Sequence, residues 1–410
     1  MEKGGFMKAV DRLINYVKIE TTSNPESNTS PTSENQFDLA RVLKEELIEL
    51  GVEKVILTDT CYVYAFIPSN VNIPTDKIGL IAHMDTAPDF SGKNVNPRIV
   101  EKYDGSDILL NNQRVLSKQR FTQLEELIGH DLLVTDGTTL LGADDKAGIS
   151  VIMTLVEYIM SHPEFKHGDI RIAFTPDEEV GKGADHFDVK LFDADYAFTF
   201  DGGHGDDLSY ETFNAASVDI EIEGLSVHPG SAKGRMINAS LIGCEFISML
   251  PVFDRPEFTE GKEGFNHLTD FNGDVSYCKL QYIVRNHDMD VFNRQLALFE
   301  KIKTFINEKY NQELVKISTN IQYNNMYEVL KDHMHIVNKM QDAMLAVGIT
   351  PKIEAIRGGT DGSRLTFMNL PCPNVGCGGG NFHGPYEYCS ITDLNRAVEV
   401  AKHLVSVKGE

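Results

Sequence analysis

The sequence has no long apolar run. No segment of its 410 residues approaches the ~18 unbroken apolar residues expected of a membrane-spanning helix. The six cysteines lie at scattered spacings without a Cys-x-x-Cys pair, so neither a thiolate zinc ribbon nor a disulfide framework is indicated. Basic residues are also few, with 38 Lys and Arg against 61 Asp and Glu. The net charge of −23 argues against nucleic acid or an anionic membrane as a partner.

The N-terminal segment is mixed and charged, and it has no apolar stretch leading to a small-residue cleavage site. We therefore expect no secretory signal and a cytoplasmic location. A hydrophobic fraction of 41% is sufficient for packed globular structure. Because 410 residues is long for one hydrophobic core, we expect two domains.

Three short apolar runs predict buried strands, and polar side chains follow each of them. The runs and the residues after them are KIGLIA (77–82) before His83 and Asp85, IRIAF (170–174) before Asp177, Glu178 and Glu179, and AFTF (197–200) before Asp201. A helix is expected over residues 147–159, which are rich in Ile, Val, Met and Leu. Strands that alternate with helices predict an α/β domain whose functional groups gather beyond the strand ends.

The pattern changes after about Thr212. Residues 217–223 (SVDIEIE) alternate apolar and acidic side chains, which is typical of a strand with one solvated face. Further elements are expected as helices near 238–249 and 290–311 and as strands near 277–284 and 315–321. We infer an α+β domain over residues 212–324, inserted into a catalytic domain formed by residues 1–211 and 325–410.

Histidines and carboxylates concentrate around these predicted strand ends. Asp144 lies in the turn GADDK before a helix, and His383 lies in the glycine-framed loop GGGNFHG. Each motif alone is more often structural, since such residues are common in turns, caps and solvated surfaces. Together they form the ligand set preferred by zinc and other divalent first-row ions. Two such cations would be neutralised by three carboxylates and one hydroxide, whereas one cation with three carboxylates would leave a negative site.

Eight strings carry a resemblance to a known family: HMDTAPD, TTLLGADDKAG, TPDEEVGKGA, FTFDGG, GLSVHPG, AKGRMINA, IRGGTDGS and NFHGPYE. Together they resemble the di-zinc exopeptidases and deacylases, the family that includes glutamate carboxypeptidase, and within it the tripeptide aminopeptidases. The resemblance extends from about His83 to the C-terminus. It implies a mixed-sheet α/β catalytic domain with helices on both faces, together with a smaller inserted α+β lid and dimerisation domain.

The resemblance also implies a set of metal ligands. His83, Asp144 and Asp201 would hold one Zn²⁺, while Asp144, Glu179 and His383 would hold a second Zn²⁺. Asp144 would therefore bridge the two ions of each chain. Co²⁺ or Mn²⁺ are possible substitutes for zinc.

Two further carboxylates would act beside the metals. The residues alone leave open which of Glu178 and Glu179 is a ligand and which is a base. The family pattern makes Glu178 the general base, which takes a proton from water and delivers it to the leaving amine. The same pattern makes Asp85 the residue that orients His83 and raises its basicity.

Four residues are candidates for substrate contact by the same resemblance. His228 would stabilise the oxyanion, and Arg357 would bind the carboxylate of a peptide. Asn238 and Arg285 are further candidates. Without the resemblance, His228 would be interpreted as a histidine in a turn.

The function implied is release of the N-terminal residue from tripeptides by a metal-held water. Short peptides would be the substrates, and the inserted domain could support a homodimer. A related dipeptidase, carboxypeptidase or N-acyl amino acid deacylase is the alternative within the same chemistry. A non-catalytic metal-binding or peptide-binding protein is the alternative from another class, although retention of Glu178 and all five ligands argues against it.

Overall fold

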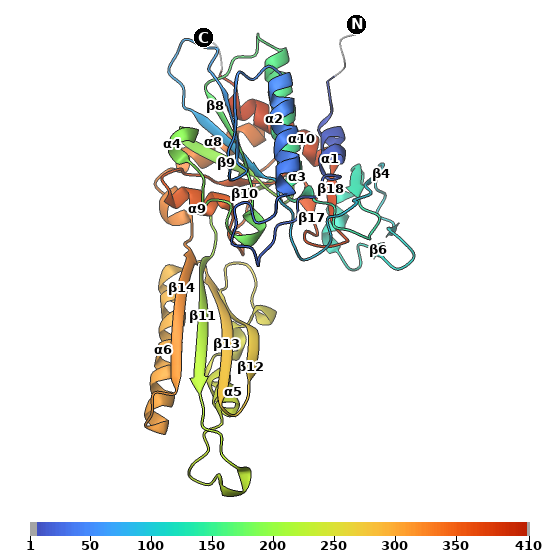
Figure 1. Ribbon diagram of the computed structural model, residues 1–410. Coiled ribbons are helices and arrows are strands. Elements are labelled where there is room, and N and C mark those ends of the chain that lie inside the picture. Colours follow the sequence, from blue (N-terminus) through green and yellow to red (C-terminus); the bar gives the residue numbers. More distant parts are fainter. Residues whose placement is uncertain (1–5, 408–410) are drawn as a thin grey trace. The chain divides into compact units, whose positions relative to one another are not determined.

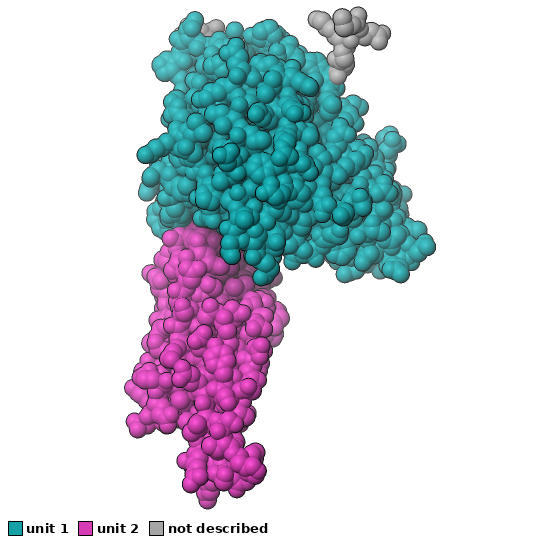
Figure 2. Space-filling model, in the orientation of Figure 1, with its two compact units in different colours: residues 1–210, 328–354, 360–410 teal, residues 211–327, 355–359 magenta. Residues whose placement is uncertain are grey.

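The computed structural model describes residues 6–407 (Figure 1). The first five residues belong to the segment in which no secretory signal is expected, and they lie outside this range. The chain divides into two compact units, coloured teal and magenta in Figure 2. The first comprises residues 1–210, 328–354 and 360–410, and the second comprises 211–327 and 355–359. Among the described residues, no helix has both the length and the apolar character needed to cross a membrane.

The first unit is built on an eight-stranded mixed sheet of order β1-β2-β8-β3-β9-β16-β10-β15. These strands are β1 (Lys54–Leu57), β2 (Val63–Ile67), β3 (Ile78–His83), β8 (Ile170–Thr175), β9 (Tyr196–Phe200), β10 (Asp207–Ser209), β15 (Lys352–Ile353) and β16 (Asn374–Val375). Strand β3 runs parallel to its neighbours β8 and β9, whereas β2 is antiparallel to β8. The three strands expected from apolar runs are confirmed, and they are adjacent.

Strands β3, β8 and β9 are buried at every position and mostly apolar because helices cover both faces of the sheet. On β3, Leu80 and Ala82 belong to one hydrophobic cluster, whereas Ile81 belongs to another. The helices that contribute to the first cluster are α1 (Ala9–Tyr16), α2 (Gln36–Glu49), α3 (Ala143–Ser161), α8 (Met334–Ala346) and α10 (Ile391–Val405). Those that contribute to the second are α4 (Val189–Phe192) and α9 (Asp361–Phe367). The expected mixed sheet with helices on both faces is therefore confirmed.

A second, four-stranded sheet in this unit was not predicted. Its order is β17-β18-β7-β4, with bounds β4 (Arg98–Val100), β7 (Leu132–Val134), β17 (Gly379–Gly380) and β18 (Tyr388–Ser390). The short pair β5 (Ile108–Leu109) and β6 (Val115–Leu116) accompanies it. Strands β17 and β18 pair antiparallel, and the loop that joins them carries His383. The sheet thus anchors both ends of that loop.

The second unit is an antiparallel four-stranded sheet of order β12-β13-β11-β14 with two helices. Its elements are β11 (Asn214–Glu223), α5 (Ala239–Met249), β12 (Phe265–Gly273), β13 (Tyr277–Asn286), α6 (Met289–Tyr310) and β14 (Val315–Tyr323). The alternation in β11 is confirmed, since Ile220 and Ile222 are buried while Glu221 and Glu223 are exposed. The buried residues of β11 and β13 pack with α5 and α6 in one hydrophobic cluster.

Two segments differ from the sequence expectation. The helical pattern of residues 329–347 predicts one helix, but this segment contains the end of α7 (Tyr327–Leu330) and the whole of α8, separated by a turn in which the amide of His333 donates to the carbonyl of Leu330. Residues 355–359 were assigned to the catalytic domain but belong to the second unit. The reason is backbone pairing, because the amide of Phe213 donates to Gly358 and that of Ile356 donates to Glu211.

Candidate metal centre

The parallel strands bring functional side chains to one edge of the sheet. His83 ends β3, the residues after β8 lead to Glu178 and Glu179, and Asp201 directly follows β9. Because these strands are parallel neighbours, their carboxyl ends lie together. Asp144 reaches the same edge from the first turn of α3.

A single glycine permits this approach of α3. A Cβ atom at Gly148 would collide with the backbone carbonyl oxygen of Phe200, the residue before Asp201. Only glycine lets the helix that carries Asp144 pack this closely against the end of β9. Gly148 therefore allows the side chains of Asp144 and Asp201 to lie close together.

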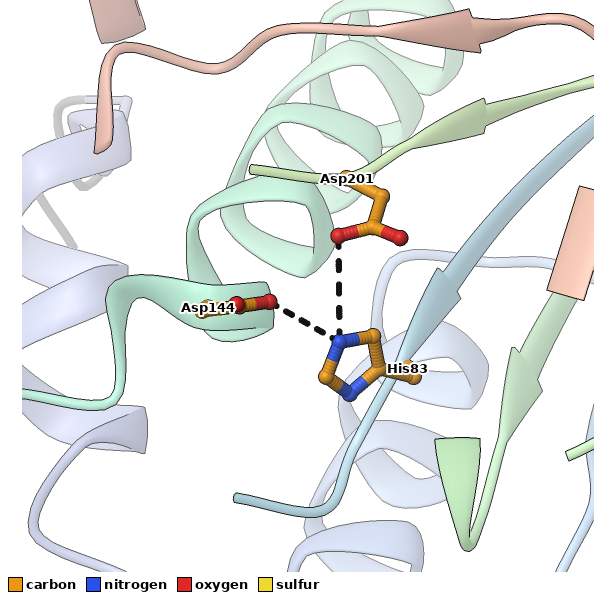
Figure 3. Close-up of side chains that lie close together, drawn as sticks. All are labelled: His83, Asp144 and Asp201. Carbon is orange, nitrogen blue, oxygen red and sulfur yellow. Dashed lines mark hydrogen bonds and ion pairs between the residues drawn. The ribbon is translucent and has the colours of Figure 1, made fainter. Parts of the chain in front are cut away.

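The first group of potential ligands is His83, Asp144 and Asp201 (Figure 3). The Nε2 atom of His83 lies 3.0 Å from Oδ1 of Asp144 and 3.8 Å from Oδ1 of Asp201. All three ligand atoms lie within 4.8 Å of one another. This spacing suits one nitrogen and two oxygens around a single divalent ion.

The second group is Asp144, Glu179 and His383. The Nε2 atom of His383 lies 2.9 Å from Oε2 of Glu179 and 3.7 Å from Oδ2 of Asp144. The two oxygens of Asp144 thus face different histidines, because Oδ1 is directed at His83 and Oδ2 at His383. Asp144 is placed to bridge two ions.

Charge and hydrogen bonding in this cluster fit cations. The Oε1 atom of Glu179 is buried and has no hydrogen-bond partner among the described residues, although a buried carboxylate oxygen normally has one. Burial, followed by the charge of Asp144, raises the pKa of Glu179 to about 7 and that of Asp201 to about 8. Hydrogen bonds to Asp144 and Glu179 raise the pKa of His383 to about 11. Burial and the mutual repulsion of these carboxylates therefore favour bound positive charge at this site, which divalent ions could supply.

Glu179, rather than Glu178, belongs to the second ligand group. Burial raises the pKa of the Glu178 carboxyl well above its usual range, and the negative charges of Asp201 and Asp361 add to that effect. Glu178 therefore lies beside the centre without belonging to either group. This geometry favours the division of roles that the family pattern implies for the two glutamates.

Asp85 joins His83 to the turn that carries these glutamates. Its carboxylate accepts hydrogen bonds from the amides of Glu178 at 2.9 Å and Glu179 at 3.2 Å. The same carboxylate lies 3.4 Å from Nδ1 of His83, and its backbone oxygen lies 3.1 Å from that nitrogen. One side chain is thus in contact with a potential ligand and with the backbone of the candidate base.

Two acidic residues that hold the backbone at Asp144 and at His83 were missed by sequence reasoning. Buried Glu387 accepts hydrogen bonds from the amides of Leu141, Gly142 and Asp144 at 2.7, 2.8 and 3.1 Å. Buried Asp145 accepts from the amide of His83 at 3.2 Å. Both lie within the strings NFHGPYE and TTLLGADDKAG, so the family resemblance was the signal that could have identified them.

A third support comes from the N-terminal loop. Residues 21–34, rich in Ser, Thr, Asn and Pro, predict an exposed loop, yet Thr32 is only 4% exposed and holds Asp177, the residue before Glu178. Its amide donates to both carboxylate oxygens of Asp177, at 3.0 and 2.9 Å, and its hydroxyl donates at 2.5 Å. Gln36 donates to the same carboxylate at 2.7 Å. The loop is buried where it packs against the turn that carries Glu178 and Glu179, because it satisfies the otherwise costly buried charge of Asp177.

The four candidate substrate contacts all belong to the second unit. Exposed His228 accepts at Nδ1 from the amide of Gly230, and Asn238 caps α5 by accepting from the amide of Leu241. Arg285 donates to the carbonyl of Ala216 and lies over the ring of Tyr323. Each has a structural partner within its own unit, and a role at the metal centre stays a prediction.

Arg357 has the most extensive of these contacts. Its Nη1 donates to the carbonyls of Gly261 and Glu263 at 2.8 Å each, and its Nη2 donates to the hydroxyl of Thr259 at 3.0 Å. The guanidinium also lies over the ring of Phe213. None of these hydrogen bonds involves Nε. Nη2 also lies 3.4 Å from the carbonyl oxygen of Thr259, so a carboxylate that approaches the edge formed by Nε and Nη2 would compete with Thr259.

Comparison with known proteins agrees with this geometry. Residues 136–407 match the model of "Peptidase family M20/M25/M40". Peptidase T of Clostridium perfringens strain 13 is 51% identical over 98% of this chain and 99% of its own length. Peptidase T of Caldanaerobacter subterraneus is 49% identical over 98% of this chain and 99% of its own length.

Solved structures share the fold. Aminopeptidase PepT from Bacillus cereus superposes with a TM-score of 0.76 at 21% identity, covering 98% of this chain and 99% of its own. The YXEP protein of Bacillus subtilis, described as a dinuclear metal-binding peptidase from the M20 family, has a TM-score of 0.64 at 14% identity, with 97% of each chain covered. From the family match and the identity to curated relatives, the chain belongs to peptidase family M20/M25/M40 and, within it, to the peptidase T group.

Proposed function

We propose that the chain is a tripeptide aminopeptidase that holds two Zn²⁺ ions, with Co²⁺ or Mn²⁺ as possible substitutes. The observation that carries this proposal is the arrangement of Asp144, whose two carboxylate oxygens face His83 and His383 in two separate ligand groups. Relatives about half identical over nearly the full length bear the name peptidase T, which supports the choice of substrate class.

In this proposal His83, Asp144 and Asp201 hold one ion, and Asp144, Glu179 and His383 hold the other. The ions would supply a Lewis-acidic centre that lowers the pKa of water and polarises a carbonyl. Their ligand set of nitrogen and carboxylate oxygen is compatible with zinc.

Glu178 is the residue that moves the proton. Its carboxylate would accept a proton from the attacking water and deliver it to the nitrogen of the leaving peptide. Asp85 fixes the backbone amide of Glu178 and contacts the ring of His83, so it positions both the base and a ligand. The raised pKa of Glu178 suits a group that must hold a proton between these two steps.

The second unit would supply the remaining substrate contacts. His228 would stabilise the oxyanion, Arg357 would bind the C-terminal carboxylate of the peptide, and Asn238 and Arg285 are weaker candidates. A homodimer formed through this unit and a cytoplasmic location also stay predictions.

A peptide panel tests the proposal. Di-, tri- and tetrapeptides with free and blocked ends would be incubated with the protein, and the products and the metal content would be measured. We expect release of the N-terminal residue from free tripeptides and two equivalents of metal per chain. Preferred cleavage of dipeptides, of C-terminal residues or of N-acyl groups would instead indicate the related activities, and no turnover with zinc, cobalt or manganese would indicate a binding protein.

A further inference from the structure

The metal centre is exposed on one side. The side chains of His83, Glu179, Asp201 and Asp144 are 3%, 5%, 13% and 15% exposed, respectively. In contrast, the side chain of His383 is 44% exposed. A substrate approaching the ligands therefore meets His383 first.

Asp89 lies at this exposed edge. It ends the string HMDTAPD, its side chain is 63% exposed, and its Oδ2 lies 3.6 Å from Nδ1 of His383. The other ring nitrogen of His383, Nε2, faces Glu179 and Asp144. Asp89 is thus separated from the ligand group by one imidazole ring.

Apart from Glu178, which is assigned to proton transfer in the proposed function, the other buried carboxylates beside the ligands are already hydrogen bonded. Those that belong to neither ligand group and are buried and hydrogen bonded are Asp85, Asp145, Asp177, Asp361 and Glu387. Each of them would have to give up native hydrogen bonds to bind a cationic group, at a cost in stability. Asp89 is accessible, and its contact with Nδ1 of His383, at 3.6 Å, is longer than a hydrogen bond, so a cation could bind its carboxylate without breaking one.

An enzyme that acts only on free N-termini has to recognise an ammonium group next to two metal cations. The α-ammonium lies one carbon away from the scissile carbonyl, so it must sit near the metals that repel it. A carboxylate at the rim of the centre offsets that repulsion. An N-acyl group carries no charge and gains nothing from the same carboxylate.

Resting on the proposed function, we propose that Asp89 is a specificity-determining residue that binds the α-ammonium group of the substrate's N-terminal residue. It faces the exposed side of the centre, beside His383, where the end of a short peptide would lie. The Asp89 carboxylate and the ammonium form a charge-assisted hydrogen bond. This contact distinguishes free peptides from acylated ones.

The test compares trialanine with propionyl-Ala-Ala, which is the same peptide without its amino group. With the zinc-loaded wild-type chain, kcat/KM should strongly favour trialanine. Asp89→Asn should lower kcat/KM for trialanine roughly 10- to 100-fold, in line with the loss of a hydrogen bond between charged groups. It should leave propionyl-Ala-Ala and the zinc content unchanged. Asp59→Asn, at an exposed loop residue of the same unit, is the matched control and should alter neither substrate.

Inhibition provides the same comparison if the propionyl peptide turns over too slowly. L-alaninamide carries the ammonium group and propionamide lacks it, so Asp89→Asn should weaken inhibition by the first alone. Equal losses for both substrates together with lower zinc content would show that Asp89 only positions His383, and unchanged kinetics would show that it does neither. Both results overturn the proposal. Failure of the wild-type chain to cleave any free tripeptide would instead refute the proposed function.

Discussion

The carboxylate of Asp85 accepts a hydrogen bond from the backbone amide of Glu178 at 2.9 Å. This contact fixes the main chain at Glu178 without involving its side chain, which lies outside both ligand groups. The main chain at Glu178 is thus positioned by Asp85, while the Glu178 carboxylate stays available to exchange a proton. Removing the proton acceptor should therefore affect turnover and leave the metals in place.

Glu178→Gln is expected to retain the fold and metal content, because the amide is nearly isosteric with the carboxylate. Turnover should fall by about two to four powers of ten, the usual contribution of general base catalysis. Steady-state kinetics and atomic spectroscopy on the same samples measure both effects. Near-normal turnover, or loss of metal, would mean that the roles of Glu178 and Glu179 are assigned incorrectly.

Asp144→Ala should reduce the content of both metals, because Asp144 is the one residue shared by the two ligand groups. Its loss also removes the negative charge that lies between two cations. His83→Ala and His383→Ala should each weaken mainly one site. Metal content per chain, measured by atomic spectroscopy, tests this, and equal partial losses in all three variants would contradict the bridging role.

The metal-free chain should lose stability as the pH rises from about 6 to about 9. Asp201 and Glu179 have ordinary pKa values of 3.8 and 4.5, which are raised to about 8 and about 7 in the folded chain. The pKa of His383 is raised from 6.5 to about 11. The folded chain binds more protons than the unfolded chain up to about pH 7 through Glu179, up to about pH 8 through Asp201 and above about pH 6.5 through His383, so rising pH favours unfolding.

Thermal unfolding of chelator-treated protein measures this effect. Tm should fall with rising pH, and the increase in Tm on adding zinc should be larger at the alkaline end. Asp201→Asn, which removes one of the shifted carboxyls, should give a shallower slope. A Tm that stays constant or increases over the range would show that these groups do not hold protons in the metal-free fold.

Thr32→Val should weaken the support of the turn that carries Asp177, Glu178 and Glu179. The hydroxyl of Thr32 donates to buried Asp177, and losing a hydrogen bond to a charged group should lower the free energy of unfolding by about 1.5–3 kcal/mol. We expect kcat to fall with unchanged metal content, because Glu178 follows Asp177 directly. Asn28→Ala, at an exposed position of the same loop, is the control. Full activity of Thr32→Val would show that the loop stabilises the fold alone.

Amidating the C-terminus of a good tripeptide should cost ~2–5 kcal/mol in kcat/KM if Arg357 binds its carboxylate in a desolvated site. The same amidation should cost almost nothing in Arg357→Ala. Because Arg357 also bonds Thr259, the control is Thr259→Val, which loses that structural contact and should keep the full amidation penalty. If the losses from amidation and from Arg357→Ala simply add, Arg357 does not recognise the carboxylate.

Much of the fold follows from local patterns. The strands that end at His83 and before Asp201 are apolar because both faces are buried, and that pattern is visible in a few residues. Strand β12 was missed because most of its residues are exposed and its sequence, FNHLTDFNG, does not alternate. A strand of this kind is defined by its partner β13 rather than by its own residues.

Local sequence patterns likewise identify only some residues of the metal centre. His83 and Asp144 were identifiable because local motifs mark the places where a strand ends and a helix begins. Glu387 and Thr32 were not, since their hydrogen bonds reach Gly142 and Asp177 in segments far away along the chain. No periodicity or spacing encodes such a contact. The supporting residues of a site are therefore harder to find from sequence than its ligands.

Along the sequence, the second unit is inserted between potential ligands of the same ion. Asp144 and Glu179 precede the insertion and His383 follows it, so an ion bound by all three would tie together parts of the chain that are distant along the backbone. Such an ion acts as a removable cross-link, closing a long loop that would otherwise be entropically free in the unfolded chain. During synthesis, this link cannot form until the ribosome has translated the chain as far as His383. The earlier ligands could acquire one ion during synthesis, whereas the second would mark a finished chain.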